Sequence, residues 1–232
     1  MKFKKISSLA LIPLIAASSF AISQEGTDTK IEEVLVTGSY LKSSAKDGAS
    51  PIVIVDRDNI DQMGAMSISD ITRNMTANSG AENVPDSFTS GSTQGTSNVN
   101  LRGLGLGSTL VLVNGRRNTL AAAVANDGSS FVDTSMIPAI AIERVEVLKE
   151  GAAAVYGSDA IAGVVNYITR SDFVGTEIGV FQQSTTSDSQ TDTQFSFLHG
   201  WADESTNVVV AAQYMDRSNL SGADRPTLIE NA

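Results

Sequence analysis

The sequence predicts an α+β fold, in which a domain with a small mixed β-sheet and short helices precedes a set of longer antiparallel strands. Residues 142–170 read as a strand, a tight turn, about one turn of helix, a glycine break and a second strand. Asn114-Gly115 follows an apolar run, and both residues tolerate the positive φ of a type I′ hairpin turn. Three later segments, 174–183, 191–202 and 208–219, have the length of long strands and are separated by polar turns.

The composition argues against several classes of function. A net charge of −10 disfavours nucleic acid as a partner, because phosphate binding needs a basic surface. Cysteine is absent and His199 is the only histidine, which argues against disulfides, thiolate or histidine metal sites and a serine-histidine triad. We therefore expect no cofactor.

Residues 1–23 have the features of a secretory signal peptide. Lysines at the start precede the apolar core Leu9–Ala17, and small residues at 19–21 or 21–23 offer a cleavage site. This core is shorter than the roughly 20 residues of a membrane-spanning helix. No later segment approaches such a helix, so a mature chain that enters a membrane would have to do so as a β-barrel.

Residues 31–38, with the sequence IEEVLVTG, are rich in the apolar and β-branched side chains that favour a strand. They could form an ordinary edge strand. Because a polar tract, 39–49, follows, they could equally be an exposed extended segment that pairs with another chain.

Residues 52–55 form a short apolar run that predicts a strand, and residues 58–63 predict a helical turn. A second helix has clearer signals. Ser67 and Asp70 form a capping-box pattern, the apolar face of the helix consists of Ile68, Ile71 and Met75, and Asn78 and Gly80 are expected to end it.

Glycines 103, 105 and 107 raise the possibility of a nucleotide-binding loop between a strand at 98–101 and the next element. A dinucleotide site requires a helix after such a loop, whereas Thr109–Val113 is a strand pattern. The pattern therefore disfavours nucleotide binding.

Two stretches rich in small and polar residues, 79–97 and 118–130, predict long loops. Such loops could bind a ligand with many hydroxyl groups, or they could simply be solvated.

The strand at 142–148 carries the charged residues of greatest interest. A period of two places Val145 and Val147 on one face, and Ile142, Arg144, Glu146 and Leu148 on the other. Glu143 and Glu146 then lie on opposite faces and cannot share a substrate proton. We therefore predict that the protein is not an enzyme.

In their order along the chain, these motifs resemble those of TonB-dependent outer-membrane receptors. Residues 31–38 resemble the TonB box, Leu101-Arg102-Gly103 and the hairpin 112–116 resemble two plug motifs, and 143–147 (ERVEV) with Tyr156-Gly157 resembles the end of the plug. One departure is Ala162, where the family usually has the first glycine of a pair. The resemblance implies four regions: a signal peptide (1–23), a TonB box with a flexible linker (24–49), a plug domain (50–170) and the incomplete start of an outer-membrane β-barrel (171–232).

The resemblance also implies partners and sites. Periplasmic TonB would bind Glu33, Val34, Leu35, Val36, Thr37 and Gly38, and a charge cluster between plug and barrel wall would comprise Arg102, Glu143, Arg144 and Glu146. The implied function is uptake of an unidentified ligand, energised through TonB and its inner-membrane complex. The implied location is the outer membrane, with plug and box accessible from the periplasm, or the periplasm if only this fragment is made. Too few residues precede the box for the additional signalling domain of some members.

The length of the chain leaves two further hypotheses open. Barrels of this family have about 22 strands, whereas residues 171–232 offer three, so we expect a fragment or a truncated product. Aromatic residues at 195, 197 and 201 suit a lipid-facing side, but a small soluble sheet would also fit. The alternative is an autonomous periplasmic binding or interaction module with a plug-like fold. A soluble enzyme is a weaker possibility.

Overall fold

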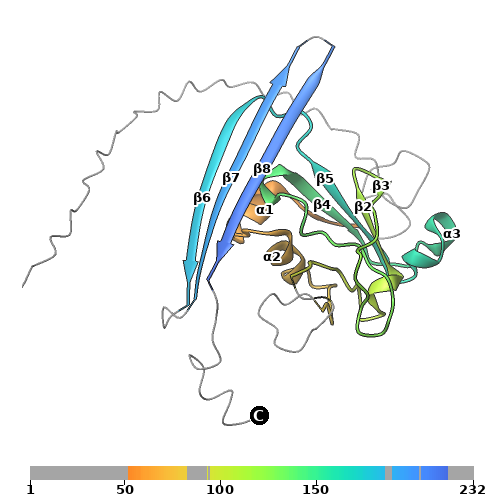
Figure 1. Cartoon of the computed structure of the whole chain (residues 1–232). Helices are drawn as coiled ribbons and strands as arrows, with labels where there is room; N and C mark the ends of the chain where they lie inside the picture. Colours follow the sequence, from red (N-terminus) through yellow and green to blue (C-terminus); the bar gives the residue numbers. More distant parts are fainter. Residues whose placement is uncertain (1–51, 83–92, 94, 186–189, 204, 219–232) are drawn as a thin grey trace, which may run out of the picture. The chain divides into compact units, whose positions relative to one another are not determined.

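The computed structural model describes residues 52–82, 93, 95–185, 190–203 and 205–218 (Figure 1). The predicted signal peptide and the predicted TonB box with its linker lie outside the described residues. Within the described part of the chain, no helix is long and apolar enough to cross a membrane.

Residues 52–169 build a five-stranded mixed sheet. Its strands are β1 (Ile52–Val55), β2 (Thr109–Val113), β3 (Arg116–Arg117), β4 (Ile142–Leu148) and β5 (Gly163–Thr169), in the order β1-β4-β5-β2-β3. Only the β2–β5 pair is parallel; the others are antiparallel. The predicted mixed sheet is confirmed, with β4 and β5 at its centre.

Short helices connect and cover these strands: α1 (Arg57–Gln62), α2 (Ile68–Arg73), α3 (Ala153–Tyr156) and the 3₁₀ turns η1 (Leu106–Ser108), η2 (Ala139–Ala141) and η3 (Ser158–Ala160). The Ser67 side chain accepts a bond from the Asp70 backbone N–H, and the Asp70 carboxylate accepts one from the Ser67 N–H. The predicted capping box is therefore confirmed, although α2 ends at Arg73, before Asn78.

The two faces of the sheet bury different sets of side chains. One face packs against α1 and α2, as Figure 1 shows. This larger core contains Ile60, Ile68, Ile71, Met75, Val111, Val145, Val147, Val165 and Tyr167. The other face packs against the segment from α3 to η3 through Leu110, Leu112, Leu148, Ala152, Ala160 and Val164.

A bulge at the start of β4 changes the predicted register. Ile142 pairs with Thr169 and Arg144 with Ile168, so Glu143 is one extra residue in β4. Because of this residue, Ile142 joins the core that contains Val145 rather than the face of Arg144. The simple alternation predicted for 142–148 is wrong at this end of the strand.

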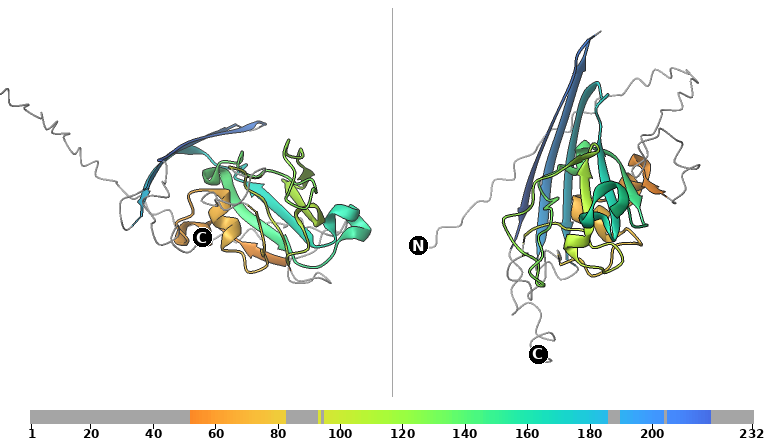
Figure 2. Two further views of the ribbon diagram at one scale, coloured as in Figure 1. Left: turned by 60° about the horizontal axis from the view of Figure 1, so that its bottom comes forward. Right: turned by 90° about the vertical axis from the view of Figure 1, so that its right-hand side faces the viewer.

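Three long antiparallel strands follow: β6 (Gly175–Ser184), β7 (Thr191–Ala202) and β8 (Asn207–Arg217). They form a separate sheet in the order β6-β7-β8, which is visibly curved in Figure 2. The three predicted strands are confirmed to within two residues at each end. Below, this sheet is called the wall.

Two other predictions have mixed outcomes. Asn114 and Gly115 have φ values of 51° and 75°, and they connect β2 to β3, as expected for the predicted hairpin.

Residues 98–101 do not form the predicted strand. A single bridge joins Leu101 to Asn78, and asparagine side chains take the bonds that a strand would have made, as when Asn78 Oδ1 accepts the Asn100 N–H.

Gly163, the first residue of β5, provides a test of this packing. Its φ is +136°, and a Cβ atom there would overlap the Leu148 carbonyl oxygen and lie 2.8 Å from Leu101 Cδ1. Gly163→Ala should lower the free energy of unfolding by about 2–5 kcal/mol, because the backbone strain of an alanine at this φ adds to the cost of the steric overlap. Gly64→Ala is the matched control: φ is +62° but no atom lies within 4 Å, so the loss should be about 1 kcal/mol. Equal losses in urea-induced unfolding would contradict the account.

Candidate functional site

Three of the four residues of the predicted charge cluster lie together on β4. Arg144 Nη1 is 2.7 Å from Glu143 Oε1, and Arg144 Nε is 3.0 Å from Glu146 Oε1. The exposed fractions of their side chains fall from 37% for Glu143 through 19% for Arg144 to 1% for Glu146. The cluster therefore extends from the surface to a buried carboxylate.

The sheet itself holds the buried carboxylate in place. Asn166 lies opposite Glu146 on β5, and its Nδ2 donates to Glu146 Oε2 at 3.3 Å. Asn166 Oδ1 in turn accepts the backbone N–H of Gly115, in the β2–β3 turn. Burying a charge costs desolvation free energy unless the charge is paired and hydrogen-bonded. The ion pair with Arg144 and the hydrogen bond from Asn166 offset this cost for Glu146.

Arg102, the fourth predicted member of the cluster, contacts another part of the plug-like sheet. Its Nη2 donates to the Ile161 carbonyl oxygen, and the residue sits in a tight turn with a φ of 58°. Its place in the cluster stays a prediction.

The prediction that Glu143 and Glu146 lie on opposite faces of β4 needs correction, because both pair with Arg144. The extra residue at the bulge accounts for this difference.

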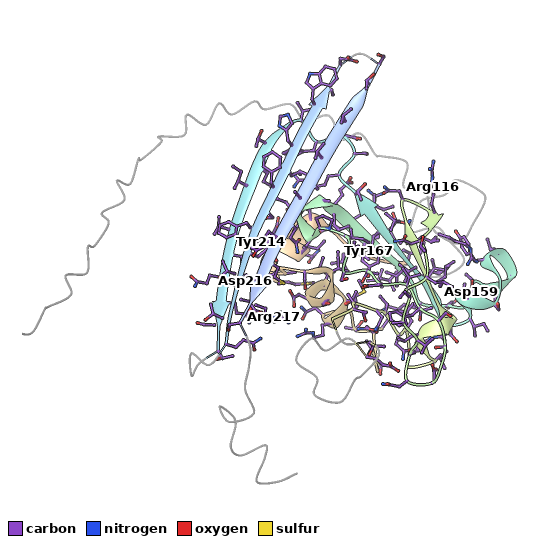
Figure 3. The ribbon with its side chains drawn as sticks, viewed as in Figure 1. Arg116, Asp159, Tyr167, Tyr214, Asp216 and Arg217 are labelled. Atoms are coloured by element: carbon purple, nitrogen blue, oxygen red, sulfur yellow. The ribbon has the colours of Figure 1, made fainter. Side chains whose placement is uncertain are left out.

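Tyr167 lies in the larger core next to this region, and Figure 3 shows it within the sheet. Complete burial raises the pKa of its phenol far above the usual value, and the nearby Thr134 hydroxyl offsets this only in part. Thr134 Oγ1 donates to the Ser97 carbonyl oxygen. Thr134 thus lies between the core of the sheet and the loop at Ser97.

The two predicted loops are joined to each other where the structure describes them. The Asn126 N–H donates to the Glu82 carboxylate at 2.9 Å, and the Ser97 N–H donates to Asp133 Oδ1 at 2.9 Å. A cavity of about 390 Å³ lies beside the second loop and is lined by Leu110, Arg117, Leu120 and Phe131, among others. The described parts of the two loops are therefore joined, and they are a candidate for ligand contact.

Arg170 connects the plug-like sheet to the wall. Its backbone N–H donates to the Ala141 carbonyl oxygen of η2, and its guanidinium lies 2.7 Å from Glu177 and 4.4 Å from the centre of the Phe173 ring. Phe173 in turn lies against Gly200 on β7, where any Cβ atom would overlap the Phe173 carbonyl. The junction is therefore closely packed.

The wall has two chemically different faces. The face with Gln194, Ser196, Gly200 and Gln213 is mostly polar or small and is more buried. The opposite face is exposed and carries most of the large apolar side chains: Ile178, Val180, Phe195, Phe197, Trp201, Val208, Val210 and Tyr214. On this face Thr176 Oγ1 and His199 Nδ1 lie 2.8 Å apart. Figure 3 shows Tyr214, Asp216 and Arg217 in succession towards one end of β8.

Among the described residues, no three His, Asp or Glu side chains gather in a way that could hold a metal ion. The charged groups of β4 are paired with one another, which suits a switch whose contacts are exchanged. The sequence had not singled out Arg57, Asn166, Arg170 or Gln213, because each acts through a partner more than five residues away in the chain.

Comparison with known families identifies a match to the TonB-dependent Receptor Plug Domain over residues 44–164, which is more than half of the 232-residue chain.

Solved structures share the fold. A mutant of the ferric enterobactin receptor PfeA from Pseudomonas aeruginosa is 23% identical, with a TM-score of 0.53, 74% of this chain covered and 25% of that chain. The siderophore receptor PirA from Acinetobacter baumannii is 24% identical, with a TM-score of 0.52 and coverages of 74% and 25%. The ferric citrate transporter FecA in its unliganded form is 18% identical, with a TM-score of 0.57; the match covers 76% of this chain and 27% of that chain. The chain spans about a quarter of the length of these proteins.

Removing Arg144 tests the cluster. Arg144→Met should lower the free energy of unfolding by about 3–5 kcal/mol, because Glu146 would remain buried without its cation. Adding Glu146→Gln to that variant should restore most of the loss, since no uncompensated charge is left. Denaturant-induced unfolding of the purified proteins measures both. A loss below about 1 kcal/mol in Arg144→Met, or no recovery in the double variant, would show that the pair is not coupled.

Proposed function

Because the chain belongs to the TonB-dependent receptor plug domain family, we propose that it forms the N-terminal part of an outer-membrane receptor that imports a ligand into the periplasm. The plug domain is a module of transport receptors and not an enzyme, which agrees with the prediction from the sequence. Members of the family are outer-membrane receptors.

The observation that carries this proposal is the continuity between the plug-like sheet and the wall. β5 leads through the packed junction at Arg170 directly into β6, and the wall directs its polar side chains, such as Gln213, towards the plug. Its other face is apolar and exposed from Ile178 on β6 to Tyr214 on β8. Alternation of this kind is what a barrel strand between lipid and interior requires.

We propose that residues 1–23 direct export and that residues 33–38 are the TonB-binding segment. An extended segment can add to the edge of a sheet in a partner, where backbone hydrogen bonds resist pulling and alternate side chains give specificity. The polar tract 39–49 would connect this segment to β1. The energy for uptake would then reach the plug as a pull on its N-terminus.

The charge cluster and the loops have distinct roles in this proposal. Glu143, which is more exposed than Arg144 and Glu146, would contact further barrel strands, whereas Glu146 is buried within the sheet. The joined loops around Glu82 and Asn126 would contact the imported ligand. Arg102, whose side chain also bonds to the Ile161 carbonyl oxygen, stays a predicted member of the cluster.

A proline in the binding segment tests the role of TonB. Val36→Pro should abolish capture of the receptor by the purified periplasmic domain of TonB, because proline removes a backbone donor and interrupts strand addition. Val34→Pro should have the same effect. Ser43→Pro, in the polar tract, is the matched control and should bind TonB as the parent does. Capture of Val36→Pro at the parent level would refute the assignment.

Cell fractionation tests the location of the chain. The receptor that carries this sequence should be recovered with the outer membrane, because its lipid-facing strands would belong to a closed barrel. Recovery of this sequence from its own cell as a folded, soluble periplasmic monomer would instead support the autonomous module with a plug-like fold.

A further inference from the structure

Strand β2 has one edge that its neighbour covers only in part. β3 pairs with Leu112 and Val113 alone and ends at Arg117. The next residue forms a local bond in place of strand pairing, because Asn118 Oδ1 accepts the Thr119 N–H at 2.8 Å. On this side, the first three residues of β2 therefore have no neighbouring strand among the described strands. Below, this part of β2 is called the open edge.

The direction of the backbone groups along β2 follows from its pairing with β5. Val113 lies opposite Tyr167, and the Asn114 N–H donates to the Tyr167 carbonyl oxygen at 2.9 Å. Successive residues of a strand direct their N–H and C=O groups to alternate sides, so the even-numbered residues of β2 face β5. Thr109 and Val111 therefore direct their backbone groups towards the open edge.

Two of these backbone groups have no hydrogen-bond partner among the described residues: the Thr109 C=O and the Val111 N–H. The Thr109 N–H donates to the Leu106 carbonyl oxygen. Thr109 is only 7% exposed and Val111 only 3%. Buried backbone groups are nearly always paired, so an acceptor and a donor that point to the same edge indicate a missing partner.

A cavity lies along the open edge. Its volume is about 390 Å³, and Thr109 and Val111 both line it. This volume is within the range of small-ligand sites and much larger than one ordered water requires. The apolar part of the lining consists of Leu106, Leu110, Leu120, Phe131 and Val132.

The two sides of the open edge differ in chemistry. Leu110 packs on the face of α3 and η3, where Arg117 and Asp159 form an ion pair that borders the cavity. Val132 packs on the face of α1 and α2. Alternate side chains of an extended chain at this edge would meet the ion pair on one side and the apolar lining on the other. An oligosaccharide, with hydroxyl groups on all sides, would place some of them against the apolar lining.

We propose that the open edge binds an extended peptide, which adds as a strand beside Thr109–Val111 and places an apolar side chain against Leu120 and Phe131. One residue of the peptide donates its N–H to the Thr109 carbonyl oxygen and accepts the Val111 N–H, and the alternate side chains give selectivity. The site does not depend on the proposed function. That the peptide is the ligand which the receptor imports rests on it.

Binding of capped pentapeptides tests the site without TonB. The probe is a library of the form acetyl-Ala-Xaa-Xaa-Xaa-Ala-amide, offered to the purified receptor that carries this sequence, with retained members identified by mass spectrometry. Members with a leucine, valine or phenylalanine at an Xaa position should be retained. Methylating the backbone nitrogens of a retained peptide one at a time should weaken binding about tenfold at one position, where the bond to the Thr109 carbonyl oxygen is lost.

Two results of this assay would overturn the site. One is a library from which no member is retained. The other is a retained peptide that tolerates methylation at every nitrogen, because its binding would then not use the backbone of β2.

Hydrogen exchange at single-residue resolution tests where the peptide lies. With a retained peptide bound, the Val111 amide should exchange at least about tenfold more slowly, since its N–H gains a partner. The amides of Leu110 and Leu112 face β5 and should keep their rates. An unchanged rate at Val111, or equal slowing at all three amides, would contradict strand addition at this edge.

Two exposed leucines provide matched variants of the receptor. Leu120→Glu places a charge at the apolar lining and should weaken peptide binding at least about tenfold. Leu104→Glu is the control, because Leu104 is about as exposed and is not among the described residues that line the cavity. Parent-level binding by Leu120→Glu, or an equal loss in both variants, would refute the site.

Uptake by cells separates the site from the proposed function. Accumulation of a retained peptide in the periplasm should require both the receptor and TonB, and it should fall in Leu120→Glu. Peptide binding without TonB-dependent uptake would contradict the import of the peptide and leave the site standing. TonB-dependent uptake of another ligand by a receptor that retains no peptide would overturn the site and leave the proposed function standing.

Discussion

The pairing of β4 with β5 is the interaction on which the rest of this structure depends. β5 is hydrogen-bonded on both sides, and its partner β4 brings Glu146 opposite Asn166, so that the buried carboxylate has a donor within the sheet. Close approach of the two strands requires a glycine at 163. The same strand continues through Arg170 into β6, and so the position of the wall is fixed from the centre of the sheet rather than from its edge.

The two faces of the sheet serve different purposes. The charges of Arg144 and Glu146 lie with Leu148 and Leu112, on the face away from α1 and α2. The contacts of η2 with Arg57 lie on the side of α1. A pull on the N-terminus would meet the edge strand β1 and Arg57 first, while β4 and β5 are held by neighbours on each side. β1 and α1 are therefore the part of the domain that a pull can release, whereas β4 and β5 are the part that resists it.

Much of the fold follows from local chemistry in the sequence. The capping box at Ser67, the turn at Asn114-Gly115 and the alternation of β6, β7 and β8 are each specified by residues close together in the chain, and these predictions are confirmed. The bulge at Glu143 was missed because alternation alone cannot reveal an extra residue. Arg102 was placed in the charge cluster by resemblance, and only the folded turn shows its bond to Ile161. Arg57 and Gln213 gain their roles from partners more than seventy residues away, for which no local pattern exists.

The central claim is that β1, α1 and η2 open independently of β4 and β5. Native-state hydrogen exchange of the receptor, followed by mass spectrometry, tests it most directly. Amides of Ile54, Ile60 and Ala139 should exchange through openings of low free energy, well before those of Val145 and Tyr167. Exchange of all five at one common rate would mean that the domain opens as a single cooperative unit, and would contradict the account.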